Sequence, residues 1–252
     1  MTDDAVRIRI GRVPVDVLTF EGAIARICEL VSSGRGGGVF TPNVDHVVMA
    51  EDDARFRDAY ARVALSLADG MPVLWGARLL GTPLPAKISG SDLLAPLVGR
   101  AATLGLRVYL LGGADGVAIA AASKLRARHP GLVIAGTASP RVDMSAPPAS
   151  RAALVKELKE AAPDLVLVAF GAPKQELFID EIAHELRPAV LLGIGASLDF
   201  VAGTVRRAPA WMSRAGLEWA FRLGQEPRRL WRRYLVQDPR FLAILARQLR
   251  SR

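Results

Sequence analysis

The chain has 252 residues, 51% of them hydrophobic, and a formal net charge of +8 at pH 7. This length and composition fit one large globular domain, or a domain with an appendage, and exclude an intrinsically disordered chain. The only cysteine, Cys28, excludes a disulfide framework and a zinc–thiolate site, and it is typical of a protein in the reducing cytosol. The apolar spacing around Cys28 predicts a small core residue there.

The N-terminal stretch does not have the pattern expected of a signal peptide. It opens with acidic residues and then alternates charged and apolar residues, without the positive region and apolar core of a signal peptide. No stretch reaches the roughly 18 uninterrupted apolar residues of a membrane-spanning helix. We therefore expect a protein that is soluble or that lies on a membrane surface without crossing it.

Short runs rich in Val, Leu and Ile, each ending in glycine or a polar turn, predict buried strands. The runs cover residues 37–43, 63–70, 106–113, 131–140, 164–173 and 189–197. Helical spacing fills stretches between them, such as 117–128 and 151–162, and residues 139–150 are typical of a loop. Apolar strands alternating with amphipathic helices predict an α/β fold with a Rossmann-like, doubly wound and mainly parallel sheet.

The last part of the chain differs in charge from the rest. Residues 206–252 contain 12 Arg, no Lys and three acidic residues, a sum of +9, whereas residues 1–205 sum to −1. Three of the four tryptophans lie in the basic part, namely Trp211, Trp219 and Trp231.

This basic part is expected to be helical. No strand pattern follows Asp199, and the pairs Glu226-Pro227 and Asp238-Pro239 predict two helix starts. We therefore divide the chain into an α/β catalytic domain, residues 1–203, and a basic C-terminal helical appendage, residues 204–252.

Ligands of open parallel sheets bind at the carboxyl ends of the strands, so the residues after each apolar run are candidate site residues. Polar and glycine residues collect there. They include Thr41, Asn43, Asp69, Gly112, Gly113, Gly171, Lys174, Gln175, Gly195 and Asp199.

Asp69 is the candidate with the clearest chemistry. A carboxyl at the end of an apolar strand is partly desolvated, which raises its pKa and suits a general base. The alternative is that Asp69 and Gly70 form only a structural turn.

The other candidates keep structural alternatives too. Gly112 and Gly113 could cradle a phosphate at a helix start, but their spacing falls short of a dinucleotide-binding fingerprint. Lys174 and Gln175 could touch an anion, or their segment is only a well-formed helix start. Asp199 could accept hydrogen bonds from a ribose diol, or it caps the connector.

The sequence predicts no metal site and no bound cofactor. The three histidines are scattered, and neither a Walker loop nor a serine nucleophile elbow occurs. The Asp-x-Asp pair that usually carries a divalent metal to a nucleotide diphosphate is also missing. The charge of a bound diphosphate would have to be met by helix N-termini and basic side chains.

Eight motifs occur in the order seen in the bacterial WecG/TagA/CpsF glycosyltransferases, glycosyltransferase family 26. They are "TPNVDH", "LADGMPV", "KISGSDLL", "VYLLGG", "FGAPKQE", "GIGASLDFVAGTVRRAPAW", "GLEWAFRL" and "EPRRLWRRY". The chain resembles this family from about Val13 to about Tyr234.

Members of this family transfer a sugar from a UDP-sugar to a polyprenyl-diphosphate-linked saccharide at the cytoplasmic membrane face, with inversion and without a metal. The resemblance implies that Asp69 is the general base and that Thr41, Asn43 and Gln175 line the sugar and acceptor site. The transferred sugar stays open between N-acetylmannosamine, its uronic acid and glucose.

The resemblance also implies roles in donor binding. Asp199 would contact the uridine part of the donor. Arg222, Arg229 and Arg232 match appendage arginines that would reach over the site toward phosphates.

Two positions depart from the family pattern. Lys87 stands where arginine is usual, which keeps the charge but loses the bidentate fork. Leu198 stands where phenylalanine is usual, which removes an aromatic ring beside the donor site.

The arginines of the appendage suit diphosphates, and its tryptophans suit the boundary between membrane and water. Each basic residue near an anionic leaflet contributes about 1 kcal/mol of binding free energy. We therefore expect a peripheral protein on the inner face of the cell membrane. The alternative is a basic helix face that is merely solvated.

Two other function classes stay open from the residues alone. One is an NAD(P)-dependent Rossmann oxidoreductase, against which the incomplete glycine fingerprint stands. The other is a nucleic-acid-binding protein led by the basic tail, which would leave the strand-end motifs without a role. We expect no nucleic-acid partner, and a homo-oligomer is left open because the appendage could pack on a neighbouring subunit.

Overall fold

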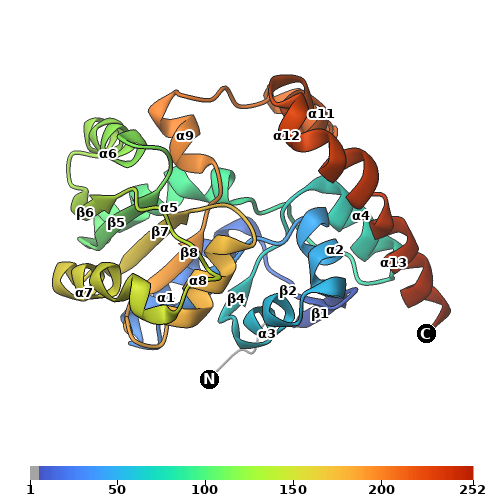
Figure 1. Cartoon of the computed structure of the whole chain (residues 1–252), viewed down its shortest axis with the longest axis horizontal. Coiled ribbons are helices and arrows are strands. Elements are labelled where there is room, and N and C mark those ends of the chain that lie inside the picture. Colours follow the sequence, from blue (N-terminus) through green and yellow to red (C-terminus); the bar gives the residue numbers. More distant parts are fainter. Residues whose placement is uncertain (1–5, 252) are drawn as a thin grey trace.

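The computed structural model describes residues 6–251, apart from the side chains of Ala210, Arg214 and Arg229. Its centre is a six-stranded parallel sheet in the order β4-β3-β8-β7-β5-β6 (Figure 1). The strands are β3 (Gly37–Phe40), β4 (Leu65–Ser66), β5 (Arg107–Gly112), β6 (Val133–Ala138), β7 (Leu165–Ala169) and β8 (Val190–Gly193). Each strand lies within one of the apolar runs of the sequence, and the predicted fold class is confirmed.

Successive residues of the central strands face opposite layers of helices. In β7, Val166 and Val168 belong to one buried apolar cluster, and Leu165 and Leu167 belong to the other. All four are buried because helices cover both faces of the sheet. This double burial explains why the strands read as continuous apolar runs.

The two layers of helices are unequal. One layer contains α1 (Phe20–Ser32), α5 (Gly90–Leu104), α6 (Val117–Arg128) and α9 (Ser197–Ala202). The other contains α2 (Val44–Asp52), α3 (Ala54–Arg62), α4 (Met71–Leu79), α7 (Ala152–Ala161) and α8 (Lys174–Ile182). The bounds of α6 are those predicted, and α7 ends one residue inside the prediction on each side. Cys28 of α1 is half-buried against its layer, in line with the small core residue expected there.

An N-terminal hairpin was not predicted. β1 (Arg7–Ile10) pairs antiparallel with β2 (Val13–Asp16), and Gly11 turns between them with a φ of 57°. All four residues of β2 are buried. The Asp16 carboxylate pairs with Arg7 at 2.6 Å and accepts the Ser66 amide of β4 at 2.7 Å, so it joins the hairpin to the edge of the main sheet.

After α9 the described chain contains helices and no strand. They are α10 (Ala210–Arg214), α11 (Glu218–Gln225), α12 (Pro227–Arg232), a π-helical segment (Arg233–Gln237) and α13 (Arg240–Arg250). Both predicted helix starts are confirmed, because α12 begins at Pro227 and Pro239 directly precedes α13. Within residues 6–251, every helix falls short of the length and hydrophobicity that a bilayer span requires.

The last helix returns to the α/β body and lies beside α2 and α4 (Figure 1). Its side chains Phe241, Ile244 and Leu245 are buried in the same apolar cluster as those helices. Gly76 of α4 makes room for this contact, since a Cβ atom there would lie 3.0 Å from the Phe241 ring.

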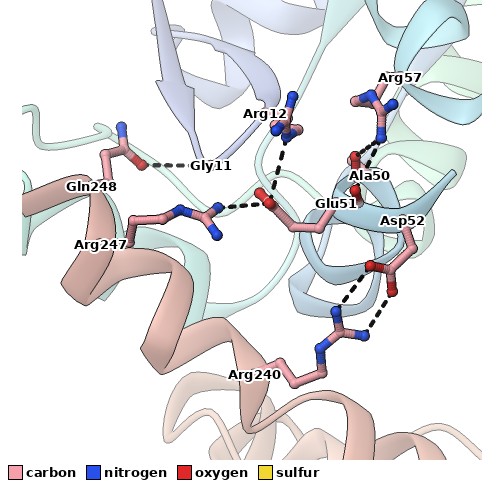
Figure 2. A network of polar contacts seen from close by, with 9 residues as sticks. All are labelled: Gly11, Arg12, Ala50, Glu51, Asp52, Arg57, Arg240, Arg247 and Gln248. Atoms are coloured by element: carbon pink, nitrogen blue, oxygen red, sulfur yellow. Dashed lines mark hydrogen bonds and ion pairs between the residues drawn. The ribbon is translucent and has the colours of Figure 1, made fainter. Parts of the chain in front are cut away.

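Ion pairs flank the apolar contact of α13 (Figure 2). Arg240 makes two hydrogen bonds to the Asp52 carboxylate, at 2.7 and 3.0 Å, and Arg247 pairs with Glu51 at 2.6 Å. The Gln248 side chain bonds to the backbone of the N-terminal hairpin at 2.7 and 2.9 Å. These contacts hold the end of the chain on the body. The division into residues 1–203 and 204–252 stays a prediction.

Candidate active site

The loops that follow β3, β4, β7 and β8 enclose a first cavity of about 460 Å³ at the carboxyl ends of the strands. The connector after α9 and the helices α11 and α12 supply its other wall. Of the residues singled out in the sequence, Thr41, Asn43, Asp69, Gly171, Gln175, Gly195, Asp199 and Arg222 line this cavity. The fold therefore brings together side chains that are far apart in the sequence.

Thr41 and Asn43 are fixed at the end of β3. The Thr41 hydroxyl donates to the Gly193 carbonyl at 3.3 Å, which joins two neighbouring strand ends. The Asn43 side chain caps α2 by accepting the His46 amide at 3.3 Å. Hydrogen bonds within the protein hold the side chains of Thr41 and Asn43. This part of the cavity wall is therefore formed before a ligand binds.

Gln175 lies in the first turn of α8 and is buried. Its carbonyl oxygen accepts the Gly195 amide at 3.1 Å, and its amino group donates to Glu176 at 2.6 Å. Gly193 leaves the space for it, since a Cβ atom there would lie 3.0 Å from the Gln175 nitrogen.

Asp69 lies between β4 and α4 on the cavity wall, and its amide donates to the Pro42 carbonyl at 2.8 Å. Burial raises the pKa of its carboxyl to about 7, the Glu218 carboxylate adds to the rise, and Lys87 opposes it. The direction and the main cause are those expected for an acid at the end of an apolar strand. Such a carboxyl can accept a proton at neutral pH.

A chain of polar contacts beside Asp69 connects the body to the appendage. Glu218, the first residue of α11, accepts the Ser213 hydroxyl at 2.8 Å. The Lys87 ammonium donates to Ser213 at 3.4 Å and pairs with Asp92 at 2.7 Å. Lys87 thus keeps the positive charge at this position of the family pattern and uses it in single-point contacts.

A second cavity of about 420 Å³ adjoins the first. The two cavities share five lining residues, which are Asn43, Asp69, Glu218, Arg222 and Arg233. Asp69 therefore lies where the cavities meet.

The remaining wall of the second cavity is largely apolar. It includes Met71, Pro72, Trp219, Tyr234, Phe241 and Leu242. Leu242 is 70% exposed and Trp219 is 40% exposed, so this cavity opens to the surface between α11 and α13.

Several residues singled out in the sequence are not among those that line the two cavities. Gly112 is the last residue of β5 and Gly113 follows it, with the Gly113 amide donating to the Ala169 carbonyl at 3.1 Å. Lys174 and Arg232 are exposed. Arg229 lies in α12, and its side chain is outside the described part of the structure.

The structure also adds residues that sequence reasoning missed. Glu218 and Arg233 line both cavities, and Arg233 pairs with Asp45 at 3.1 Å. Arg206 and the buried His46 line the first. The quoted motifs contain all of these residues, but their roles depend on how the appendage folds back, which no local pattern reports.

The appendage brings charges of both signs to the first cavity. Arg206, Arg222 and Arg233 line it beside Glu218 and Glu226, and guanidinium groups suit phosphate oxygens. Among residues 6–251, no three His, Cys, Asp or Glu side chains come together as a metal site.

Comparison with known proteins gives the same family from two directions. The family described as "Glycosyl transferase WecG/TagA/CpsF family" matches residues 8–252. A Bacillus subtilis (strain 168) protein named N-acetylglucosaminyldiphosphoundecaprenol N-acetyl-beta-D-mannosaminyltransferase is 34% identical over 210 residues, which are 83% of this chain and 79% of that protein. A protein of the same name from Bacillus spizizenii (strain ATCC 23059 / NRRL B-14472 / W23) is 31% identical over 221 residues, 88% of this chain and 83% of that protein.

These matches decide between the function classes that the residues alone left open. Neither the oxidoreductase nor the nucleic-acid binder agrees with a family match over almost the whole chain. The chain belongs to the WecG/TagA/CpsF family and is a glycosyltransferase.

Proposed function

We propose that this enzyme transfers N-acetylmannosamine from a UDP-linked donor to an N-acetylglucosamine carried on a polyprenyl diphosphate. The observation that carries the proposal is the meeting of a polar and a largely apolar cavity at Asp69. Of the three sugars that the sequence left open, N-acetylmannosamine is the one in the names of the two Bacillus relatives.

The first cavity suits the nucleotide sugar. Its volume of about 460 Å³ lies in the range of small-ligand pockets. Asp199, in the first turn of α9, lines this cavity and would accept hydrogen bonds from ribose hydroxyls. Arg206 and Arg222 offer forked donors to a diphosphate.

The second cavity suits the lipid-linked acceptor. Its apolar wall, with Met71, Tyr234 and Leu242, fits the first isoprene units of the lipid. Arg222 and Arg233, where the cavities meet, would face the acceptor diphosphate. The acceptor sugar would then reach Asp69 from this side.

The geometry supports a single inverting displacement. Asp69 takes the proton of the acceptor hydroxyl while the hydroxyl oxygen bonds to the anomeric carbon of the donor. The bond between that carbon and the UDP oxygen breaks, and UDP leaves with the electron pair. Arg222 stabilises the negative charge that develops on the departing diphosphate. Thr41, Asn43 and Gln175 hold the transferred sugar in this account.

We also propose that the reaction needs no metal. Arginines on the cavity wall offer the positive charge that a divalent ion would otherwise supply to a diphosphate. The sequence lacks the Asp-x-Asp pair that commonly holds such an ion.

We place the enzyme on the inner face of the cell membrane, with the appendage and α4 toward the lipid. Several appendage arginines pair with acids of the body, namely Arg207, Arg233, Arg240 and Arg247, so less than the full +9 is free for lipid headgroups. Exposed apolar side chains complement the remaining charge. They include Trp75, Leu79, Trp211, Trp231 and Leu242.

Vesicle co-sedimentation tests the membrane claim. We expect binding to vesicles that contain anionic lipid, reduced severalfold in Trp75→Ser and in Trp231→Ser, because each loses an exposed ring that is about half accessible. Equal binding of all three proteins, or equal binding to neutral vesicles, would contradict this orientation.

The substrate claim is tested by UDP release from a panel of UDP-sugars, with a short-chain polyprenyl-diphosphate N-acetylglucosamine as acceptor and EDTA in excess. We expect acceptor-dependent release from UDP-N-acetylmannosamine without added Mg²⁺ or Mn²⁺. Release that appears only with a divalent cation would contradict the metal-free reaction. Release from UDP-glucose alone would contradict the assigned sugar.

A further inference from the structure

The buried carboxyl of Glu176 lies next to Gln175, which lines the first cavity. Glu176 of α8 is 0% exposed, and burial raises its pKa to about 7. One carboxyl oxygen, Oε1, accepts the Gln175 amino group at 2.6 Å. The other, Oε2, has no hydrogen-bond partner among the described residues. An unpartnered polar atom in the core lowers stability, so this acid calls for an explanation beyond packing.

The contacts of Gln175 allow only one orientation of its side-chain amide. The Gly195 amide can only donate, so the atom 3.1 Å from it must be the Gln175 carbonyl oxygen. The Gln175 nitrogen then points to Glu176, which accepts one of its two hydrogens. A flipped amide would set two donors against each other at Gly195. The second hydrogen of the amide has no acceptor among the described residues, and Gln175 lines the cavity.

A second pair of side chains, His46 and Tyr60, lies near the same carboxyl. The Tyr60 hydroxyl lies 2.6 Å from His46 Nδ1, and both residues are buried. Burial lowers the pKa of His46 to about 3, so the ring is neutral. Its other ring nitrogen, Nε2, lies 3.9 Å from Glu176 Oε1, the oxygen that also accepts from Gln175. Among the described residues, the polar neighbours of the carboxyl from α2 and α8 thus lie at Oε1.

We propose that Glu176 is a positioning residue for the transferred sugar: it holds the Gln175 amide so that its carbonyl bonds to Gly195 and only an N–H donor faces the cavity. A ligand atom at this place must then be an oxygen that accepts a hydrogen bond, such as a sugar hydroxyl or an acyl carbonyl. The same contact fixes the Gly195 turn after β8, which has a φ of 52° and lines the cavity.

Only the contact between Gln175 and the transferred sugar rests on the proposed function. The positioning of Gln175 by Glu176 does not, and its first test needs no substrate. The Gly195 amide hydrogen, followed by NMR hydrogen exchange, should be protected in the wild type and in Glu176→Gln, whose amide oxygen still accepts from Gln175. It should lose protection in Glu176→Met, which removes the acceptor while filling the space. Glu176→Ser, whose hydroxyl is too short to reach Gln175, replaces the methionine variant if that does not fold. Unchanged protection in the variant without an acceptor would overturn the proposal.

The second test is a double-mutant cycle on sugar transfer. Glu176→Met should lower kcat/KM for the donor by roughly tenfold or more, while Glu176→Gln should stay within about threefold of the wild type. Gln175→Leu combined with Glu176→Met should lose no more than Gln175→Leu alone, because Glu176 acts through Gln175. Losses that multiply would overturn the proposal. A wild type that transfers no sugar would contradict the proposed function and leave the exchange result to decide this one.

Discussion

In the α/β body, apolar residues buried on both faces of the sheet fix the strands, whereas the appendage meets the body mainly through ion pairs, hydrogen bonds and one buried face of α13. The two regions also differ in charge, since residues 1–205 sum to −1 and residues 206–252 to +9. No residue of α11 is buried, although this helix carries Glu218 and Arg222 to both cavities.

The difference shows how the site is divided between the two regions. The body supplies Asp69 and Thr41 from strand ends and Gln175 from the first turn of α8. The more weakly held appendage supplies charges, including Glu218, which raises the pKa of Asp69, and Arg222, which lowers it. The proposed general base is therefore held at the end of a sheet strand, and charges of the appendage adjust its pKa beside the larger effect of burial.

The largest expected effect comes from the body. We expect Asp69→Asn to lower kcat by about a hundredfold or more, because the amide cannot take the acceptor proton. UDP binding measured by calorimetry should stay within a few-fold of the wild type, since Asp69 is not assigned to the nucleotide. A loss of UDP binding together with a lower melting temperature would instead make Asp69 a structural turn residue.

The next largest effect is a difference in kcat/KM between variants of two appendage arginines. Arg222 lines both cavities and Arg232 is exposed outside them. Arg222→Gln should lower kcat/KM by about 10- to 100-fold, because a charge-assisted hydrogen bond to a phosphate is lost. Arg232→Gln is the matched control and should change kcat/KM with a short-chain acceptor less than about threefold. Equal losses in both variants would mean that the appendage acts through its overall charge.

A smaller effect concerns how α13 is attached. Phe241→Ala should lower the free energy of unfolding by about 3 kcal/mol, because it leaves a cavity against α4. Arg240→Gln should lower it far less, since its pair with Asp52 is solvent-exposed. Urea unfolding measures both values. The reverse order would show that ion pairs hold the appendage.

The main sheet could be predicted from the sequence because its strands are buried on both faces and end in glycine or polar turns. The N-terminal hairpin could not, since its strands have four residues each and Pro14 interrupts the usual strand pattern. Partners from β4 and α3, distant in the sequence, stabilise it.

The candidate site could be predicted where strand ends form it, but not where the appendage does. Asp69 and Thr41 were identifiable because strand ends define the site edge of an open sheet. Glu218 and Arg233 were missed because they reach Asp69 and Asn43 only after the appendage folds back. Gly112 and Gly113 lie at the end of a strand as expected, but β5 is farther along the sheet, and the Gly113 amide bonds to the Ala169 carbonyl instead.

The pH dependence of kcat/KM in the wild type and in Glu218→Gln tests the central claim most directly. A general base works only when deprotonated, so kcat/KM should rise with pH as Asp69 loses its proton near pH 7. Glu218→Gln removes the negative charge that raises the pKa of Asp69, so the rise should move to lower pH. Burial also raises the pKa of Glu176 to about 7, but Glu218 is not among the groups that shift it. Glu218→Gln should therefore move the titration of Asp69 and not that of Glu176. A rise that stays in place in Glu218→Gln, or no rise between pH 5 and pH 8, would contradict the account of Asp69 as a base tuned by the appendage.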